Sequence, residues 1–191
     1  QRDQPISVPF SETGPQWMNI PKRIAGHRAR AASPTAGRLA AGVSPAEVHA
    51  SVIGMHNDRM ICLTRLATIG GAPAPDVLAA DRLRQAAEDT RSAGATIVGL
   101  LKTRGSFYAA AQCVADIVAA CLCDARRVLP LSGVCRGEYG QTGACLALPR
   151  VVGSSGIEST LELPLDADEA ATLDACAAAS TTALDEARSA V

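Results

Sequence analysis

One histidine stands in a polar tip between two short apolar segments. The apolar segments cover residues 49–54 and 60–64, and the tip runs from Met55 to Arg59 with His56 inside it. A neutral imidazole accepts a proton readily near neutral pH, so histidine is a residue type that can take part in proton transfer. Because short runs rich in β-branched residues favour strands, the two segments are predicted to pair across this tip.

Motifs for several other chemistries are missing from the sequence. It has neither a G-x-G-x-x-G segment after a strand nor a G-x-x-x-x-G-K-[ST] loop, the glycine-rich devices that hold nucleotide phosphates. It also has no H-E-x-x-H, no G-x-S-x-G and no cysteine and histidine cluster with metal-ligand spacing. We therefore expect the chain to hold no metal and no cofactor, and to meet NAD only if a separate nucleotide-binding chain supplies it.

Length, charge and cysteine content narrow the class of protein. The 191 residues carry 18 Lys+Arg and 19 Asp+Glu, which fits one globular domain and provides no basic face for nucleic acid. No apolar run reaches the roughly 18 residues that a membrane span requires, so no membrane insertion is expected. The 7 cysteines form no C-x-x-C pair, which favours a reducing compartment.

The cysteines are predicted to be small buried hydrophobic residues rather than reactive thiols. This interpretation covers Cys113, Cys121, Cys145 and Cys176, and a redox role for Cys121 with Cys123 is the alternative. The first residue is Gln. We therefore expect a processed chain or a piece of something longer, and a trimmed organelle-targeting segment is one explanation.

Apolar residues recur at helical spacing in two central segments. The first is capped by Asp76 or Asp81 and runs to about Lys102, with a kink at Gly94. The second covers about residues 106–123. Its predicted inner face consists of Ala110, Val114, Ile117, Val118 and Cys121.

The other segments complete a two-part organisation. Residues 1–24 are proline-rich and predicted to form an extended arm, and residues 25–191 form the domain. Two more helices are expected, one at about 34–41 and one that opens with a capping box at Asp166 and Glu169. Further strands are predicted at 127–134, 144–152 and 157–163. Hairpin-linked strands among helices indicate the α+β class, an antiparallel sheet packed with long helices.

Residues 48–58, V-H-A-S-V-I-G-M-H-N-D, resemble the lactate/malate dehydrogenase family, whose second domain has a strand ending in glycine, a variable residue and His-Gly-Asp. Further family-like segments follow in order, at residues 68–73, 100–109, 127–130, 137–140, 156–158 and 161–166. The resemblance covers about residues 19–191. It is greatest to the bacterial-type malate dehydrogenase branch, and it includes only the C-terminal, substrate-binding half.

In that family a histidine accepts the proton of the substrate hydroxyl while hydride passes to NAD. An aspartate orients the histidine, and an arginine clamps the substrate carboxylate. The resemblance places His56 at the histidine position. Arg28 and Arg30 are the candidates for the carboxylate clamp, since a guanidinium matches a carboxylate through paired hydrogen bonds.

Two further positions are carried over from the resemblance. Asn57 replaces the glycine that follows the histidine, and Ser106 matches a small residue that lines the substrate pocket. The orienting aspartate has no counterpart, because no aspartate lies between Gln4 and His56. His56 is therefore interpreted as a structural relic of the family or, as the alternative, a working base.

The leading hypothesis is a non-catalytic malate dehydrogenase-like pseudoenzyme domain. It would act as an accessory subunit of a larger protein assembly, at the mitochondrial matrix or the matrix face of an inner-membrane complex, with a cytoplasmic location as the alternative. A homodimer is compatible with either location. The alternative function is the substrate-binding half of a split or fragmentary NAD-dependent malate dehydrogenase that oxidises malate to oxaloacetate. A third hypothesis is a regulatory module that binds a dicarboxylate through Arg28 or Arg30.

Overall fold

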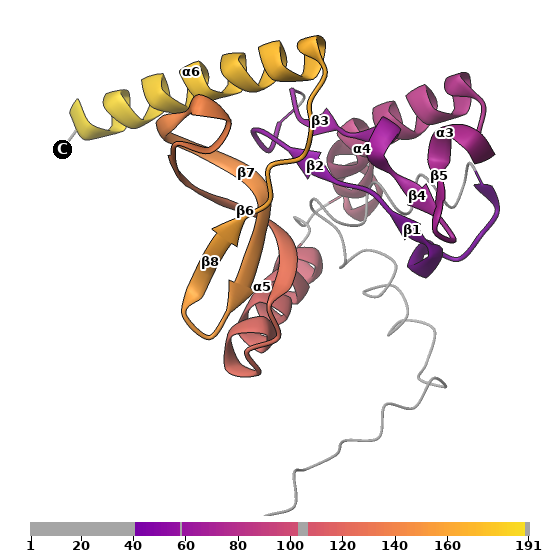
Figure 1. Cartoon of the computed structure of the whole chain (residues 1–191), viewed down its shortest axis with the longest axis horizontal. Coiled ribbons are helices and arrows are strands. Elements are labelled where there is room, and N and C mark those ends of the chain that lie inside the picture. The colour runs from indigo at the N-terminus through magenta and orange to yellow at the C-terminus, as the bar shows by residue number, and fades with distance from the viewer. Residues whose placement is uncertain (1–40, 58, 103–106, 190–191) are drawn as a thin grey trace, which may run out of the picture.

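The computed structural model describes residues 41–57, 59–102 and 107–189, and it has the α+β organisation expected from the sequence (Figure 1). The predicted arm at 1–24 and nearly all of the predicted helix at 34–41 lie outside the described residues. Within the described part, the short strands form a three-stranded sheet β1-β4-β5 and a pair β2-β3, and the longer strands form the sheet β6-β7-β8.

The short strands include the pair that flanks the histidine-bearing tip. Their bounds are Val48–His49 for β1, Val52–Ile53 for β2, Ile61–Cys62 for β3, Thr68–Ile69 for β4 and Ala72–Pro73 for β5. As predicted, β2 and β3 pair antiparallel across the tip, with Ile53 opposite Ile61. The single strand expected at 49–54 is instead divided, because His49 pairs with Thr68 in a different sheet. Short 3-10 turns, η1 at Pro45–Glu47 and η2 at Thr64–Leu66, flank these strands.

The first long helix has the predicted length but not the predicted start. After the short α3, Ala74–Val77, helix α4 spans Ala80–Leu101. Its N-cap is Ala79, with no side-chain cap, so the predicted capping by Asp76 or Asp81 is wrong. Gly94 lies inside this one continuous helix rather than at a break in it.

Helix α5, Phe107–Leu122, turns only part of the predicted inner face toward the core. Ala120 is fully buried, and Ile117 and Cys121 pack with it against Leu129 of β6. Ala110, Val114 and Val118 of the predicted inner face are exposed instead, Val114 by 59%. Because alanines lie on all sides of this helix, its apolar pattern does not show clearly which face is buried.

The largest sheet is an antiparallel meander. Strand β6, Arg127–Arg136, pairs with β7, Thr142–Gly153, which pairs in turn with β8, Gly156–Thr160. The 3-10 turn η3, Glu138–Gly140, joins the first two strands. Leu146 and Leu148 of β7 are buried at the centre of the main core.

The final helix, α6 at Ala167–Ser189, packs on β7 and closes this core (Figure 1). The predicted capping box is confirmed: Asp166 accepts a hydrogen bond from the Glu169 N–H, and Glu169 accepts one from the Asp166 N–H. Leu173, Cys176 and Ala177 of α6 are buried together with residues of β2, β3 and β7. Among the described residues, no helix is both long and apolar enough to cross a membrane.

Candidate functional site

The histidine-bearing tip is a tight turn between β2 and β3. Its first end is fixed by Gly54, whose N–H and C=O both hydrogen-bond to Ala147 of β7 at 2.9 Å. Within the turn, the Asn57 N–H donates to the Met55 carbonyl, and the Met60 N–H donates to the Asn57 carbonyl. These bonds fix the backbone on both sides of His56, which is exposed.

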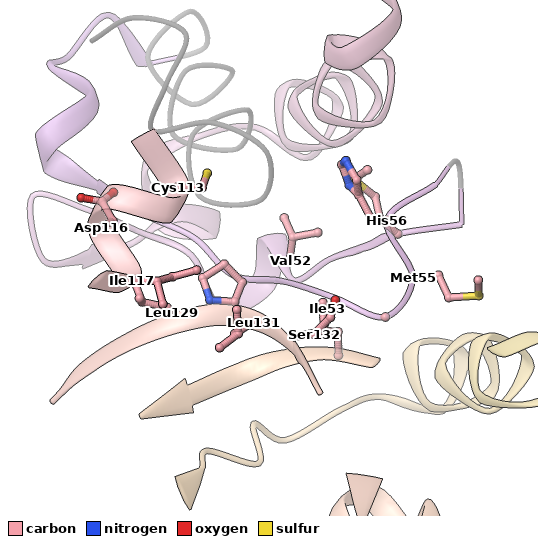
Figure 2. Close-up of a pocket in the computed structure, with 14 residues that line it drawn as sticks. Val52, Ile53, Met55, His56, Cys113, Asp116, Ile117, Leu129, Leu131 and Ser132 are labelled. Atoms are coloured by element: carbon pink, nitrogen blue, oxygen red, sulfur yellow. The ribbon is translucent and has the colours of Figure 1, made fainter. Parts of the chain in front are cut away.

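His56 lies at a cavity of about 280 Å³ formed by the turn, α5 and β6 (Figure 2). The walls are mostly aliphatic, with Val52 and Met60 on the hairpin side and Ile117 and Leu131 on the opposite side. A mostly apolar cavity with a few polar groups is the usual form of a small-molecule site. The polar contributions come from His56, Cys113, Asp116 and Ser132.

The carboxylate in this cavity does not take the orienting role that the family's aspartate has. Asp116 lies on the opposite side of the cavity from His56, with Val52 between them in Figure 2. Its Oδ1 is 3.4 Å from a guanidinium nitrogen of Arg127, an ion pair within the α5 and β6 region. Asp116 therefore binds Arg127, which ties α5 to the start of β6.

The sequence-predicted site residues are only partly within the described structure. His56 is at the cavity, and the Asn57 carboxamide oxygen accepts a hydrogen bond from the Arg59 N–H at 2.9 Å, so Asn57 shapes the turn. Arg28, Arg30 and Ser106 lie outside the described residues. The sequence analysis did not identify Asp116 as a cavity residue, and it treated Cys113 only as a buried thiol. Both positions depend on which face of α5 is turned inward.

The thiol next to the hairpin, that of Cys62, is unreactive. Cys62 of β3 is buried, and burial raises the pKa of its thiol although Arg91 opposes the effect. Its sulfur also donates a weak hydrogen bond to the Ala87 carbonyl. Because the thiolate is the reactive form, Cys62 contributes packing rather than chemistry.

The cavity suits a small substrate better than a metal or a dinucleotide. The described residues contain no group of three or more His, Cys, Asp or Glu side chains that could hold a metal ion. The residues that line the cavity include no lysine or arginine for a pyrophosphate. The described cavity residues therefore offer no binding site for the pyrophosphate of a dinucleotide.

Residues 28–191 match the family model described as the lactate/malate dehydrogenase, alpha/beta C-terminal domain. The chain therefore belongs to the lactate/malate dehydrogenase family and carries its C-terminal domain. The match confirms both the family and the fold class that the motifs indicate.

Within that family, the curated relatives are malate dehydrogenases. The chain is 39% identical over 136 residues to malate dehydrogenase from Desulforudis audaxviator, covering 71% of the chain and 44% of the relative. It is 40% identical over 133 residues to malate dehydrogenase from Roseiflexus sp. strain RS-1, covering 70% of the chain and 43% of the relative. The chain thus spans less than half the length of these relatives.

Solved structures agree with this relationship. The malate dehydrogenase of Salinibacter ruber matches with a TM-score of 0.78 and 33% identity, over 83% of this chain and 52% of that one. Lactate dehydrogenase of Eimeria maxima, solved with NADH and oxamate, matches with a TM-score of 0.79 and 27% identity, over 87% and 53%. The similarity covers about half of each solved chain.

Proposed function

We propose that this chain is the substrate-binding half of an NAD-dependent malate dehydrogenase, in which His56 accepts the proton of the substrate hydroxyl. The observation that carries the proposal is the position of His56, exposed on a backbone-fixed turn at the cavity. The names of the relatives supply the substrate class, a 2-hydroxy dicarboxylate such as malate.

Each side chain at the cavity has a distinct part in this proposal. The neutral imidazole of His56 takes the proton, and the aliphatic walls keep water from the reacting carbon. Arg28, Arg30 and Ser106 lie outside the described residues, but the family resemblance implies that Arg28 or Arg30 would hold a substrate carboxylate through its guanidinium group and that Ser106 would line the substrate pocket. A nucleotide-binding half would hold NAD, which would supply the hydride acceptor for this reaction.

An exposed apolar face on α5 supports the proposal of a protein partner. On α5, Val114, Val118 and Leu122 lie one helical turn apart, and Leu122 is 82% exposed. Apolar side chains at such spacing are typical of an interface. We assign this face, the α5 stripe, to contact with a protein partner, either a nucleotide-binding half or another subunit.

A second candidate function is a non-catalytic accessory subunit of a larger, mitochondrial assembly. One sequence observation favours it: no aspartate lies between Gln4 and His56 to orient the imidazole. An enzyme that loses this kind of aspartate is slowed by about 10⁴ in the serine protease case. In the accessory subunit, His56 takes part in no reaction, and the subunit acts through the contact of its α5 stripe with a partner.

Isolation of the endogenous protein under mild conditions separates the two candidates. A malate-oxidising particle with a nucleotide-binding half, inactivated by His56→Ala but not by His49→Ala, supports the enzyme. His49 is a suitable control because it is exposed in β1 and does not line the cavity. A large particle with no malate-dependent NAD reduction, unchanged by His56→Ala, supports the accessory subunit and overturns the first proposal.

A further inference from the structure

The turn that carries His56 rests on the final helix, at a buried cysteine. Cys176 of α6 has no exposed surface and belongs to the main core, together with Ile53 and Ile61 from the two strands that the turn connects. Met55, the residue before His56, packs against the same core. The thiol is therefore immediately beneath the turn.

The first contact is with Gly54, two residues before His56. Gly54 has a φ of +94°, a conformation that glycine adopts readily and other residues rarely do. A β-carbon added at Gly54 would lie 3.4 Å from the Cys176 sulfur, an ordinary van der Waals distance. The sulfur therefore lies beside Gly54, at the point where the chain leaves β2.

The second contact is with the other end of the turn. The Cys176 sulfur donates a weak hydrogen bond to the Arg59 carbonyl at 3.8 Å. One buried thiol therefore reaches the backbone on both sides of residues 55–59. Because the turn's internal hydrogen bonds join Met55, Asn57 and Met60, a displacement at either end also moves His56.

Independent contacts hold α6 in place against the segment that follows β3. The Arg65 guanidinium is 2.8 Å from a Glu169 carboxylate oxygen and also donates to the Pro164 carbonyl. Glu169 is in the first turn of α6, two helical turns before Cys176. The position of the sulfur relative to the turn is therefore determined by the fold and not only by local packing.

We propose that Cys176 is a positioning residue for His56. Its sulfur lies beside Gly54 and donates a weak hydrogen bond to the Arg59 carbonyl, and these two contacts set the backbone from which the imidazole reaches the cavity. The proposal rests on the proposed function, in which His56 is the proton acceptor, but its structural part can be measured without catalysis. Cys176 itself touches no substrate.

The test uses the full chain with ¹³C-labelled histidine and compares Cys176→Ala with Cys135→Ala. Cys135 is the matched control, because it is a buried cysteine of the same core but lies on β6 and does not donate a hydrogen bond to the Arg59 carbonyl as Cys176 does. We expect Cys176→Ala to shift the His56 ring signal and to speed amide exchange of Asn57 and Met60 about fivefold, the effect of one lost hydrogen bond. Cys135→Ala should lower stability with neither change.

A conservative variant provides the rescue and a second route if Cys176→Ala does not fold. Cys176→Ser keeps a donor for the Arg59 carbonyl and should restore most of the exchange protection, whereas Cys176→Val keeps the bulk and should not. The proposal is overturned if Cys176→Val and Cys135→Ala leave the His56 signal and the turn amides identical to wild type. Failure of the proposed function is a separate result: His56→Ala would then leave malate oxidation unchanged, whatever the ring signal shows.

Discussion

The guanidinium of Arg150 lies 3.1 Å from the Glu138 carboxylate, and only 3% of the arginine side chain is exposed. The remaining donors of Arg150 reach the carbonyls of Leu131 and Gly133 and the hydroxyl of Thr160. This buried cation thus joins β6, β7 and β8 with the η3 turn. The sheet that forms one wall of the cavity depends on it.

Removal of Glu138 should destabilise the chain strongly. Glu138→Ala leaves Arg150 buried without its counter-charge, and loss of one partner of a buried pair costs about 3–5 kcal/mol. Urea denaturation measures the change in the free energy of unfolding. Asp185→Ala is the control, since its ion pair with Arg188 is exposed and contributes little. Equal effects of the two variants would contradict the structural role of Arg150.

The same carboxylate should make stability depend on acid pH. The Arg136 N–H, the Glu138 N–H, and then the Thr160 and Arg150 side chains lower the pKa of Glu138 to about 2 from its usual 4.5. A lowered folded-state pKa stabilises the protein above about pH 4.5, and this contribution is lost as the pH falls toward 2. Glu138→Gln should flatten this part of a stability profile measured from pH 5 to pH 2. A wild-type profile already flat in that range would refute the assignment.

The motif around His56 could be predicted from the sequence because it depends on local order. The run of β-branched residues ending at Gly54, followed by the polar tip, specifies the β2–β3 turn with little help from the rest of the fold. The capping box of Asp166 and Glu169 is equally local, and the structure confirms it. Such features can be recognised in a sequence because a few neighbouring residues specify them.

The parts that could not be predicted depend on contacts between distant segments. Which side of α5 is buried is decided by Leu129 and Val152 of the sheet, and the alanine-rich helix offers no clear apolar face to anticipate it. The position of Asp116 at the cavity follows from that choice. Cys176 and Gly54 lie close together although they are more than a hundred positions apart in the sequence, and no periodic pattern of residues indicates such a proximity.

Tyr139→Phe should destabilise the junction between η3 and the segment before α6. The Tyr139 hydroxyl accepts a hydrogen bond from the Leu163 N–H at 2.6 Å and donates one to the Leu163 carbonyl. Loss of the hydroxyl leaves both backbone groups partly buried and unsatisfied, at a cost of about 1–3 kcal/mol. Thermal and urea denaturation measure this loss. Val134→Ala, which changes an exposed side chain, is the control.

The cysteines should differ in their reaction with a small maleimide. Cys123 is exposed and should be labelled first, whereas Cys62, Cys135 and Cys176 are buried. Burial also raises the thiol pKa of Cys62 and of Cys135, which lowers the fraction of reactive thiolate. Peptide mass spectrometry after timed labelling gives the order. Early labelling of Cys135 in the folded chain would contradict the packing of the main core.

The α5 stripe should matter for association and not for folding. Val114→Ser, Val118→Ser and Leu122→Ser replace exposed side chains, so each should change the free energy of unfolding by no more than about 0.5 kcal/mol. If a polypeptide covers this face, the triple variant loses its partner in native mass measurements and keeps its stability.

Ala120→Ser is the matched control on the inner face, because its side chain is fully buried against Leu129 and Val152. Ala120→Ser should lower the free energy of unfolding but leave the contact between the α5 stripe and its partner in place. Retention of every partner by the triple variant would assign the contact to another surface of the chain.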